Sequence, residues 1–182
     1  MAGRTGLEAR ALHLPMPPTA ARPDFNAAQF RQALGQFATG VTIVTARSSG
    51  GELAGLTVSS FNAVSLEPPL VLWSLNRASQ AMALLAGVSH YAVHVLGHDQ
   101  QALAERFAGP REARWLGLAP EPGAGGAPLL AGCVAVFECF NRSRYDEGDH
   151  VIFVGEVERC SWRADASPLL FHGGRFYTEH PL

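Results

Sequence analysis

Residues 41–59 read VTIVTARSSGGELAGLTVS, a pattern typical of a β-hairpin. β-Branched side chains dominate residues 41–45, and a second strand-like run covers residues 53–59. The segment between them contains Ser48, Ser49, Gly50 and Gly51, which favour a tight turn. The pattern therefore predicts two antiparallel strands near the start of a mainly β protein.

The rest of the chain predicts more strands. Strand-like runs cover residues 70–75, 90–96, 133–140 and 150–160, and a Gly-Gly hairpin covers residues 171–176. A polar turn is expected over residues 141–149, between the two longest runs. Because proline has no backbone N–H, Pro68 and Pro69 are expected to keep the residues before them out of a regular ladder.

Helices are expected to be few and short. The first is predicted over residues 27–38, where Asn26 and Gln29 have the spacing of a capping box and Phe25 and Phe30 that of a hydrophobic staple. Two more are predicted, one over residues 79–86 and one that Asp99 begins and Gly109-Pro110 ends. Many short strands with a few flanking helices predict a mainly β, barrel-like fold.

Length and composition favour one globular domain. The chain has 182 residues, of which 47% are hydrophobic, so it can bury a substantial core. We assign residues 25–182 to this domain and residues 1–24, which carry three arginines and four prolines, to a flexible N-terminal arm. A transit peptide is the alternative for the arm, because its composition is basic with few acidic residues.

Charge and hydropathy argue against several partners. The 14 basic and 16 acidic side chains give a net charge of -2, so neither nucleic acid nor an anionic membrane surface is an expected partner. Apolar runs fall short of the roughly 18 residues that a membrane-spanning helix needs. The three cysteines are odd in number and lack C-x-x-C spacing, so a reducing cytoplasm fits best and no zinc site is expected.

Other familiar chemistries lack their motifs. Glycines cluster at residues 123–126 but run into Pro128, so the strand–glycine–helix context of a dinucleotide-binding Rossmann fold is missing. The serines of TVSSF lack the flanking glycines of a hydrolase elbow. His94 and His98 are four apart, but on a strand this spacing does not aim both imidazoles at one metal.

Six motifs in order resemble one family. They are FATGVTIVT, GLTVSSF, VSLEPPL, LNRAS, GDHVIFVGEV and PLLFHGGRFY, and they extend over about residues 30–177. The chain resembles the flavin reductase-like family with the FMN-binding split-barrel fold, the small reductase components of two-component flavin monooxygenases. The resemblance implies a Greek-key type split β-barrel that forms a homodimer and passes hydride from NADH or NADPH to FMN or FAD, for use by a separate oxygenase.

The resemblance also implies a flavin site. The residues that match it are Thr57, Val58, Ser59, Ser60, Ser74, Leu75, Asn76, Ser79, Gln80, Arg106 and Phe107. The turn at residues 57–60 is expected to hold the ring and ribityl chain, and the others to complete the nucleotide pocket. Hydroxyls and turn amides suit the polar edge of a flavin and its phosphate.

The resemblance places the nicotinamide nucleotide at His150, with Tyr177 as the weaker partner. A neutral imidazole at residue 150 is expected to donate to the nicotinamide amide or to a ribose hydroxyl. No catalytic side chain is expected, because hydride passes directly between the two cofactors and the protein supplies orientation.

Two alternatives share this fold class. A flavin-binding or redox-sensing module without turnover would keep the flavin turn but would not need His150. An oxidase of an amine such as a pyridoxamine phosphate would need a basic cluster to grip the phosphate, and no such cluster is evident in the sequence.

Overall fold

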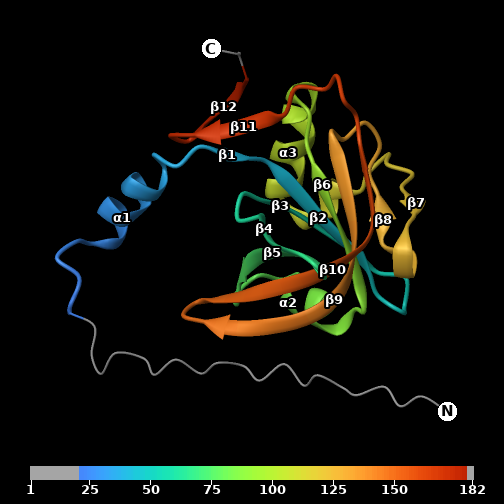
Figure 1. Ribbon diagram of the computed structural model, residues 1–182, viewed down its shortest axis with the longest axis horizontal. Helices are drawn as coiled ribbons and strands as arrows, with labels where there is room; N and C mark the ends of the chain where they lie inside the picture. The colour runs from blue at the N-terminus through green and yellow to red at the C-terminus, as the bar shows by residue number, and fades with distance from the viewer. Residues whose placement is uncertain (1–20, 180–182) are drawn as a thin grey trace.

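The computed structural model describes residues 21–179 and consists mainly of antiparallel strands (Figure 1). Its largest sheet has seven strands in the order β3-β2-β6-β9-β10-β5-β4. Their bounds are β2 (Thr42–Arg47), β3 (Leu53–Val58), β4 (Asn62–Leu66), β5 (Pro69–Asn76), β6 (His90–Val95), β9 (Ala135–Glu147) and β10 (His150–Trp162). The predicted mainly β architecture is confirmed.

A smaller sheet closes one end of the molecule. It has the order β1-β11-β12, with bounds β1 (Thr39–Gly40), β11 (Leu169–His172) and β12 (Arg175–Thr178). The pairing of Thr39 with Phe171 joins the start of the domain to its end. A two-stranded ribbon, β7 (Glu121–Pro122) and β8 (Pro128–Leu129), flanks the large sheet (Figure 1).

The helices are short. They are α1 (Ala27–Leu34), α2 (Met82–Gly87), α3 (Gln101–Ala108) and α4 (Arg111–Arg114), with 3-10 turns η1 (His98–Gln100) and η2 (Ala124–Gly126). α1 stands away from both sheets and has no buried residue (Figure 1). The site described below lies between this helix and the large sheet.

Two apolar clusters make the core, one on each side of β2. Trp73, Tyr91 and Phe153 dominate the first, where the rings of Trp73 and Phe153 stack with centroids 4.5 Å apart. Ile43 and Phe107 belong to the second. Because alternate side chains of a strand point to opposite faces, β2 is buried on both and reads as a continuous run of apolar and threonine residues.

The start of α1 matches the prediction, but its end does not. The Asn26 side chain accepts from the backbone N–H of Gln29, the Gln29 side chain accepts from that of Asn26, and the rings of Phe25 and Phe30 stack 5.3 Å apart. The helix ends at Leu34, although it was predicted to residue 38. The chain leaves the helix there because residues 39–40 pair with β11, a contact distant in sequence.

The turn predicted over residues 141–149 is wrong. β9 continues to Glu147, and Gly148 and Asp149 alone separate it from β10. The residues of this extension are polar because they are largely exposed, not because they turn. The two strands thus make one long hairpin, whose tip positions His150 at the first residue of β10.

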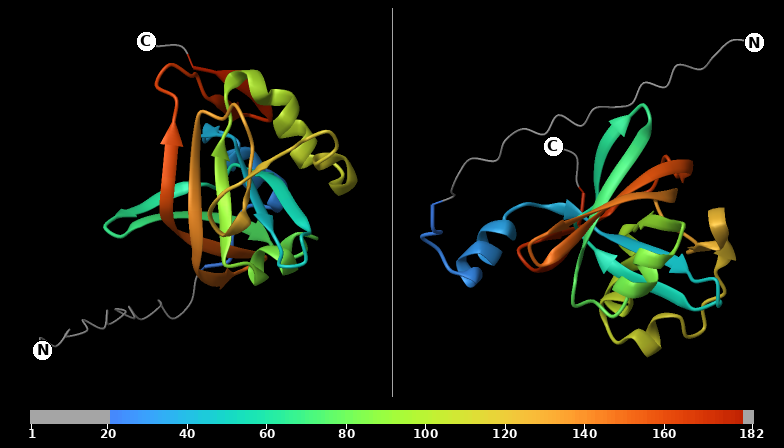
Figure 2. Two further views of the ribbon diagram at one scale, coloured as in Figure 1. Left: turned by 90° about the vertical axis from the view of Figure 1, so that its right-hand side faces the viewer. Right: turned by 90° about the horizontal axis from the view of Figure 1, so that it is seen from below.

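The two prolines do not keep the preceding residues out of the sheet, although the ladder has a register shift between Ala63 and Ser65. Residues 62–66 form β4, which pairs with β5 up to the contact of Leu66 with Pro69. Proline is tolerated here because Pro69 is the first residue of its strand and β4 is the edge of the sheet. Figure 2 shows the β4–β5 hairpin extending from the body of the molecule.

Two helix starts differ from their predictions. The second helix begins at Met82 instead of residue 79, and Ser79 and Gln80 belong to the turn before it. Asp99 lies in η1, and α3 begins at Gln101 without a side-chain cap. The predicted stop at Gly109-Pro110 is confirmed, since α3 ends at Ala108.

Candidate functional site

A groove of about 800 Å³ separates α1 from the large sheet. Four of the predicted site residues meet in it: Ser59 and Ser60 from the turn after β3, Ser74 from β5 and His150 from β10. Its other walls are Arg31, Leu34, Gly35, Phe37, Ala38, Thr39, Gly40, Phe61, Asn62 and Phe171. Residues far apart in sequence thus share one concave surface that contains both hydroxyls and aromatic rings.

The serine turn is fixed by its own hydrogen bonds. The Ser60 hydroxyl accepts from the Ser74 N–H over 2.9 Å and donates to the Ser74 carbonyl over 3.2 Å. The Thr57 hydroxyl donates to the Ala104 carbonyl of α3 over 2.7 Å. The turn is therefore tied to β5 at one end and to α3 at the other, which leaves Ser59 between them facing the groove.

A smaller apolar hollow of about 180 Å³ continues from the groove. The two share Ser59 and Phe171, and the hollow is also lined by Thr57 and Val58. The four residues of the predicted flavin turn therefore line two connected depressions. A planar ring with one polar edge matches such a surface.

Thr39 is a groove residue that sequence reasoning missed. Its hydroxyl oxygen is buried and has no hydrogen-bond partner within residues 21–179. A buried polar atom without a partner costs free energy, so the groove offers a hydroxyl that a bound polar group would satisfy. Its position in the FATGVTIVT motif, just before the alternating strand, is the feature of the sequence that could have indicated it.

His150 is oriented by its neighbour. Its Nδ1 lies 2.7 Å from an Asp149 carboxylate oxygen, and the hydrogen bond from His150 lowers the pKa of Asp149. When Nδ1–H donates to Asp149, the neutral ring presents Nε2 as an acceptor, the reverse of the donor role expected from sequence. Both side chains are exposed, at 43% for His150 and 84% for Asp149, so the imidazole is open to a ligand at the edge of the groove.

Ser79 and Gln80 line a separate hollow of about 160 Å³. Arg111 and Arg114 from α4 join them there, a pair of basic residues that the sequence did not single out. Arg111 pairs with Glu52, and Arg114 donates to the Gly55 carbonyl over 2.7 Å. Desolvation, followed by the charge of Arg111, lowers the pKa of Arg114. Each guanidinium thus has partners within the protein, and the pair adds positive charge beside Ser79.

The remaining predicted flavin residues do not line the groove, and their side chains pack in the core or form hydrogen bonds within the protein. The side chains of Leu75 and Phe107 are buried in the two core clusters, at 4% and 0% exposure. Arg106 donates to the carbonyls of Ala113 and Leu116 and so holds α4 against α3. The Asn76 side chain accepts from the Ala78 N–H over 2.8 Å, which shapes the turn that leads to Ser79.

Tyr177 lies on β12, opposite Leu170 of β11. Its ring is 47% exposed, and its nearest aromatic neighbour is His172, with centroids 6.2 Å apart. The residues of this sheet that line the groove are Thr39 and Gly40 of β1 and Phe171 of β11, and Tyr177 is not among them. The structure therefore does not bring Tyr177 into the groove with His150.

His94 has a structural position and is not grouped with His98. It is fully buried, with Nδ1 3.1 Å from the Ile43 carbonyl and Nε2 accepting from the Leu130 N–H over 3.1 Å. Burial lowers its pKa from 6.5 to about 4.

Within residues 21–179, no three His, Cys, Asp or Glu side chains are placed to hold a metal ion. No helix in the same range is long and apolar enough to cross a membrane.

Comparison with known proteins defines the family. Residues 34–180 match the model of the flavin reductase like domain, and the chain belongs to that family. It is 46% identical over 152 residues to an NADH-dependent FMN reductase of Agrobacterium fabrum, an alignment that covers 83% of this chain and 85% of that one. It is 36% identical to the reductase subunit of a flavin-dependent monooxygenase of Rhodococcus jostii, over 84% of this chain and 78% of the relative.

Solved structures agree. An NADH:FAD oxidoreductase of Streptomyces globisporus, in complex with NAD and FAD fragments, superposes with a TM-score of 0.79 at 39% identity and covers 85% of this chain and 93% of that one. The flavin reductase component of a bacterial two-component tryptophan halogenase gives a TM-score of 0.77 at 35% identity, with 84% and 98% covered. The fold is therefore the split barrel of flavin reductases.

Proposed function

We propose that this chain is an NAD(P)H:flavin oxidoreductase that supplies reduced FMN or FAD to a separate oxygenase. The observation that carries the proposal is the meeting of Ser59, Ser60, Ser74 and His150 in one groove. Relatives named as NADH-dependent flavin reductases and as reductase subunits of monooxygenases support the activity and the partner.

The groove fits a flavin. Its volume of about 800 Å³ lies within the range of sites for ligands of this size, its hydroxyls suit the polar ring edge, and the orphaned Thr39 hydroxyl gains a partner. A bound flavin would supply the hydride-accepting chemistry. In this proposal Ser59 and Thr39 bind its polar atoms, and Phe61 and Phe171 exclude water from it.

His150 positions the hydride donor. With Nδ1–H on Asp149, its Nε2 accepts from the carboxamide N–H of a nicotinamide or from a ribose hydroxyl. Holding the donor ring over the groove lowers the barrier by orientation, and no side chain has to exchange a proton.

The test is anaerobic reduction of oxidised flavin. When NADH or NADPH is added to purified protein mixed with FMN or FAD, the absorbance of the oxidised flavin near 450 nm should fall. The fall should be faster than in the same mixture without protein, by about an order of magnitude or more, because the protein positions the two cofactors. Comparing the two flavins and the two nucleotides gives the preference of the site. Flavin binding without bleaching by either nucleotide would instead favour the module without turnover.

Exposed apolar surface supports a proposal for the assembly of the protein, and its expected substrates and free thiols support one for its location. We propose a homodimer, because α1 and the segment after it leave Leu34 and Phe37 at 56% and 74% exposure, and Phe30, although it stacks on Phe25, is 49% exposed. We also propose that residues 25–182 act as one domain in the cytoplasm, where nicotinamide nucleotides are available and free thiols such as that of Cys160 persist.

A further inference from the structure

A second polar hollow lies across α2 from the Ser79 pocket. It measures about 500 Å³, and its lining residues include Arg47, Ser48, Ser49, Leu84, His90 and Gly125. Leu84 borders both hollows. None of these residues lines the flavin groove, and the proposed reductase activity leaves this hollow unassigned.

The hollow contains one positive charge with unused donors. The Nε of Arg47 donates to the Gly126 carbonyl over 3.2 Å, which fixes the guanidinium at the wall. Its Nη1 and Nη2 make no hydrogen bond or ion pair with any residue in the described part of the chain. A guanidinium held at one nitrogen presents the other two as a fork that matches the oxygens of a phosphate.

Serine residues line the hollow together with Arg47, and within residues 21–179 no carboxylate does. The Ser48 oxygen accepts from the Glu52 N–H over 3.1 Å, so its proton is available to another acceptor. Ser49 follows in the same turn and also lines the hollow. No acidic side chain is among the described residues that line the hollow, so no lining carboxylate repels an anion there.

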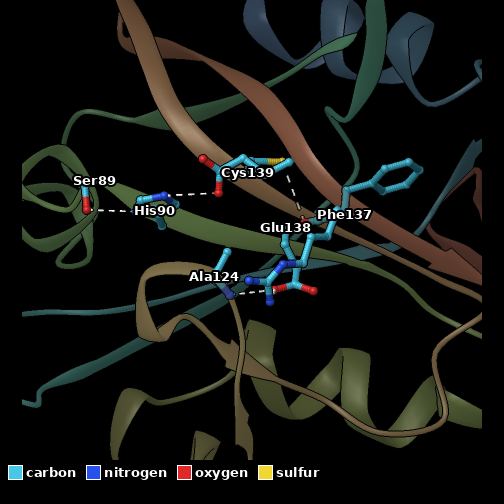
Figure 3. A network of polar contacts seen from close by, with 8 residues as sticks. Ser89, His90, Ala124, Phe137, Glu138 and Cys139 are labelled. Atoms are coloured by element: carbon cyan, nitrogen blue, oxygen red, sulfur yellow. Dashed lines mark hydrogen bonds and ion pairs between the residues drawn. The ribbon is translucent and has the colours of Figure 1, made fainter.

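His90 forms a rigid wall. Its Nδ1 lies 2.9 Å from the Ser89 hydroxyl and its Nε2 lies 3.3 Å from a Glu158 carboxylate oxygen, which contacts the ring from outside the hollow. Figure 3 shows Ser89 and His90 joined in this way, with Glu138 reaching Ala124 nearby. The ring packs so closely on Gly125 that a Cβ there would come within 2.3 Å of Nδ1.

We propose that this hollow binds the phosphate group of a small molecule, held by the Arg47 fork and the hydroxyls of Ser48 and Ser49. A dianionic phosphate monoester satisfies the three donors at once, whereas a neutral ligand leaves the guanidinium uncompensated. Two sources share this chemistry, free inorganic phosphate and the phosphate of an adenine nucleotide. The hollow is a site of its own, and its occupancy does not depend on hydride transfer in the flavin groove.

Titration calorimetry of the full chain with inorganic phosphate and with AMP tests the proposal. We expect saturable binding to the wild type, weakened about tenfold or more by Arg47→Gln, which removes a charge-assisted pair, and less by Ser49→Ala. Arg142→Gln is the matched control, because it removes an equal charge from an exposed pair with Glu156 elsewhere on the surface. That variant should bind like the wild type.

Each result decides the proposal. Binding of AMP well above that of phosphate, lost in Arg47→Gln, assigns the site to a nucleotide; equal binding of both assigns it to bare phosphate. Absence of saturable binding to the wild type, or equal loss in Arg47→Gln and Arg142→Gln, overturns the site. Riboflavin has no phosphate, so fluorescence titration of Arg47→Gln with riboflavin reports the flavin groove separately and distinguishes a failure here from a failure of the reductase assignment.

Discussion

At the scale of single residues, His150 separates binding of the hydride donor from binding of the flavin. His150→Ala should raise the KM for the nucleotide and slow flavin reduction, because the acceptor at Nε2 is lost, at a cost of about 1 to 3 kcal/mol in kcat/KM. Stopped-flow reduction measures this effect. Asp149→Asn is the companion variant, since it removes the negative charge beside Nδ1 and leaves the His150 side chain itself unchanged. Loss of flavin affinity with normal reduction in His150→Ala would contradict the assigned role.

Ser59 should behave in the opposite way. Ser59→Ala removes a hydroxyl that lines the groove and makes no side-chain hydrogen bond within the described residues, so flavin dissociation should increase by about tenfold with little change in stability. Ser60→Ala is the contrasting variant, because its hydroxyl bonds Ser74 in both directions and its loss should also destabilise the fold. Fluorescence titration and urea unfolding separate the two effects. Equal flavin affinity in wild type and Ser59→Ala would remove this serine from the site.

His94 gives the protein a pH-dependent stability. Its pKa is lowered from 6.5 to about 4 by burial, so the unfolded chain binds a proton more readily than the folded one between these values. Stability should therefore be complete above pH 6.5 and fall as the pH drops toward 4, by on the order of 3 kcal/mol. Urea unfolding at a series of pH values measures the slope. His94→Leu, although less stable at pH 7, should lose that part of the slope, and an unchanged slope would contradict the assignment.

At the scale of elements, the β9–β10 hairpin depends on a close approach to Tyr91. A Cβ at Gly155 would come within 2.3 Å of the buried Tyr91 hydroxyl, at a shift in the register between the two strands. Gly155→Ala should therefore cost about 1 to 3 kcal/mol through overpacking. Gly87→Ala is the control, because a Cβ there meets nothing within 4 Å. Urea denaturation compares the two, and equal midpoints would refute the close packing.

Local pattern was sufficient for the strands whose side chains alternate or are wholly buried. It identified β2, β3 and the hairpin of β11 and β12, because their turns have distinctive glycines. It failed for the far half of β9, since exposed strand residues resemble a polar turn, and for β4, since an edge strand tolerates a nearby proline. In both cases the deciding contacts come from a partner strand and not from the segment itself.

At the scale of the whole molecule, the candidate site too could be predicted only in part from the sequence. Motifs identified Ser59, Ser60 and His150, which the fold brings to one groove. They did not reveal Thr39 or the pair Arg111 and Arg114, because what marks these residues is burial or position beside segments distant in sequence. They also gave Leu75 and Phe107 the same standing as groove residues, although the fold buries both side chains in the core.

The apolar face of α1 is expected to determine how the protein assembles. α1 lines the groove through Arg31 and Leu34, yet it buries none of its own residues, so its apolar face has to be covered by a second copy if the groove is to have a fixed wall. Leu34→Glu should therefore shift the protein from dimer to monomer in sedimentation and weaken flavin binding in parallel. Leu116→Glu is the control, since Leu116 is similarly exposed, at 68%, on a part of the surface that does not line the groove. A wild type that sediments as a monomer at micromolar concentration would refute the dimer, and a Leu34→Glu monomer with unchanged flavin affinity would show that the groove is complete within one chain.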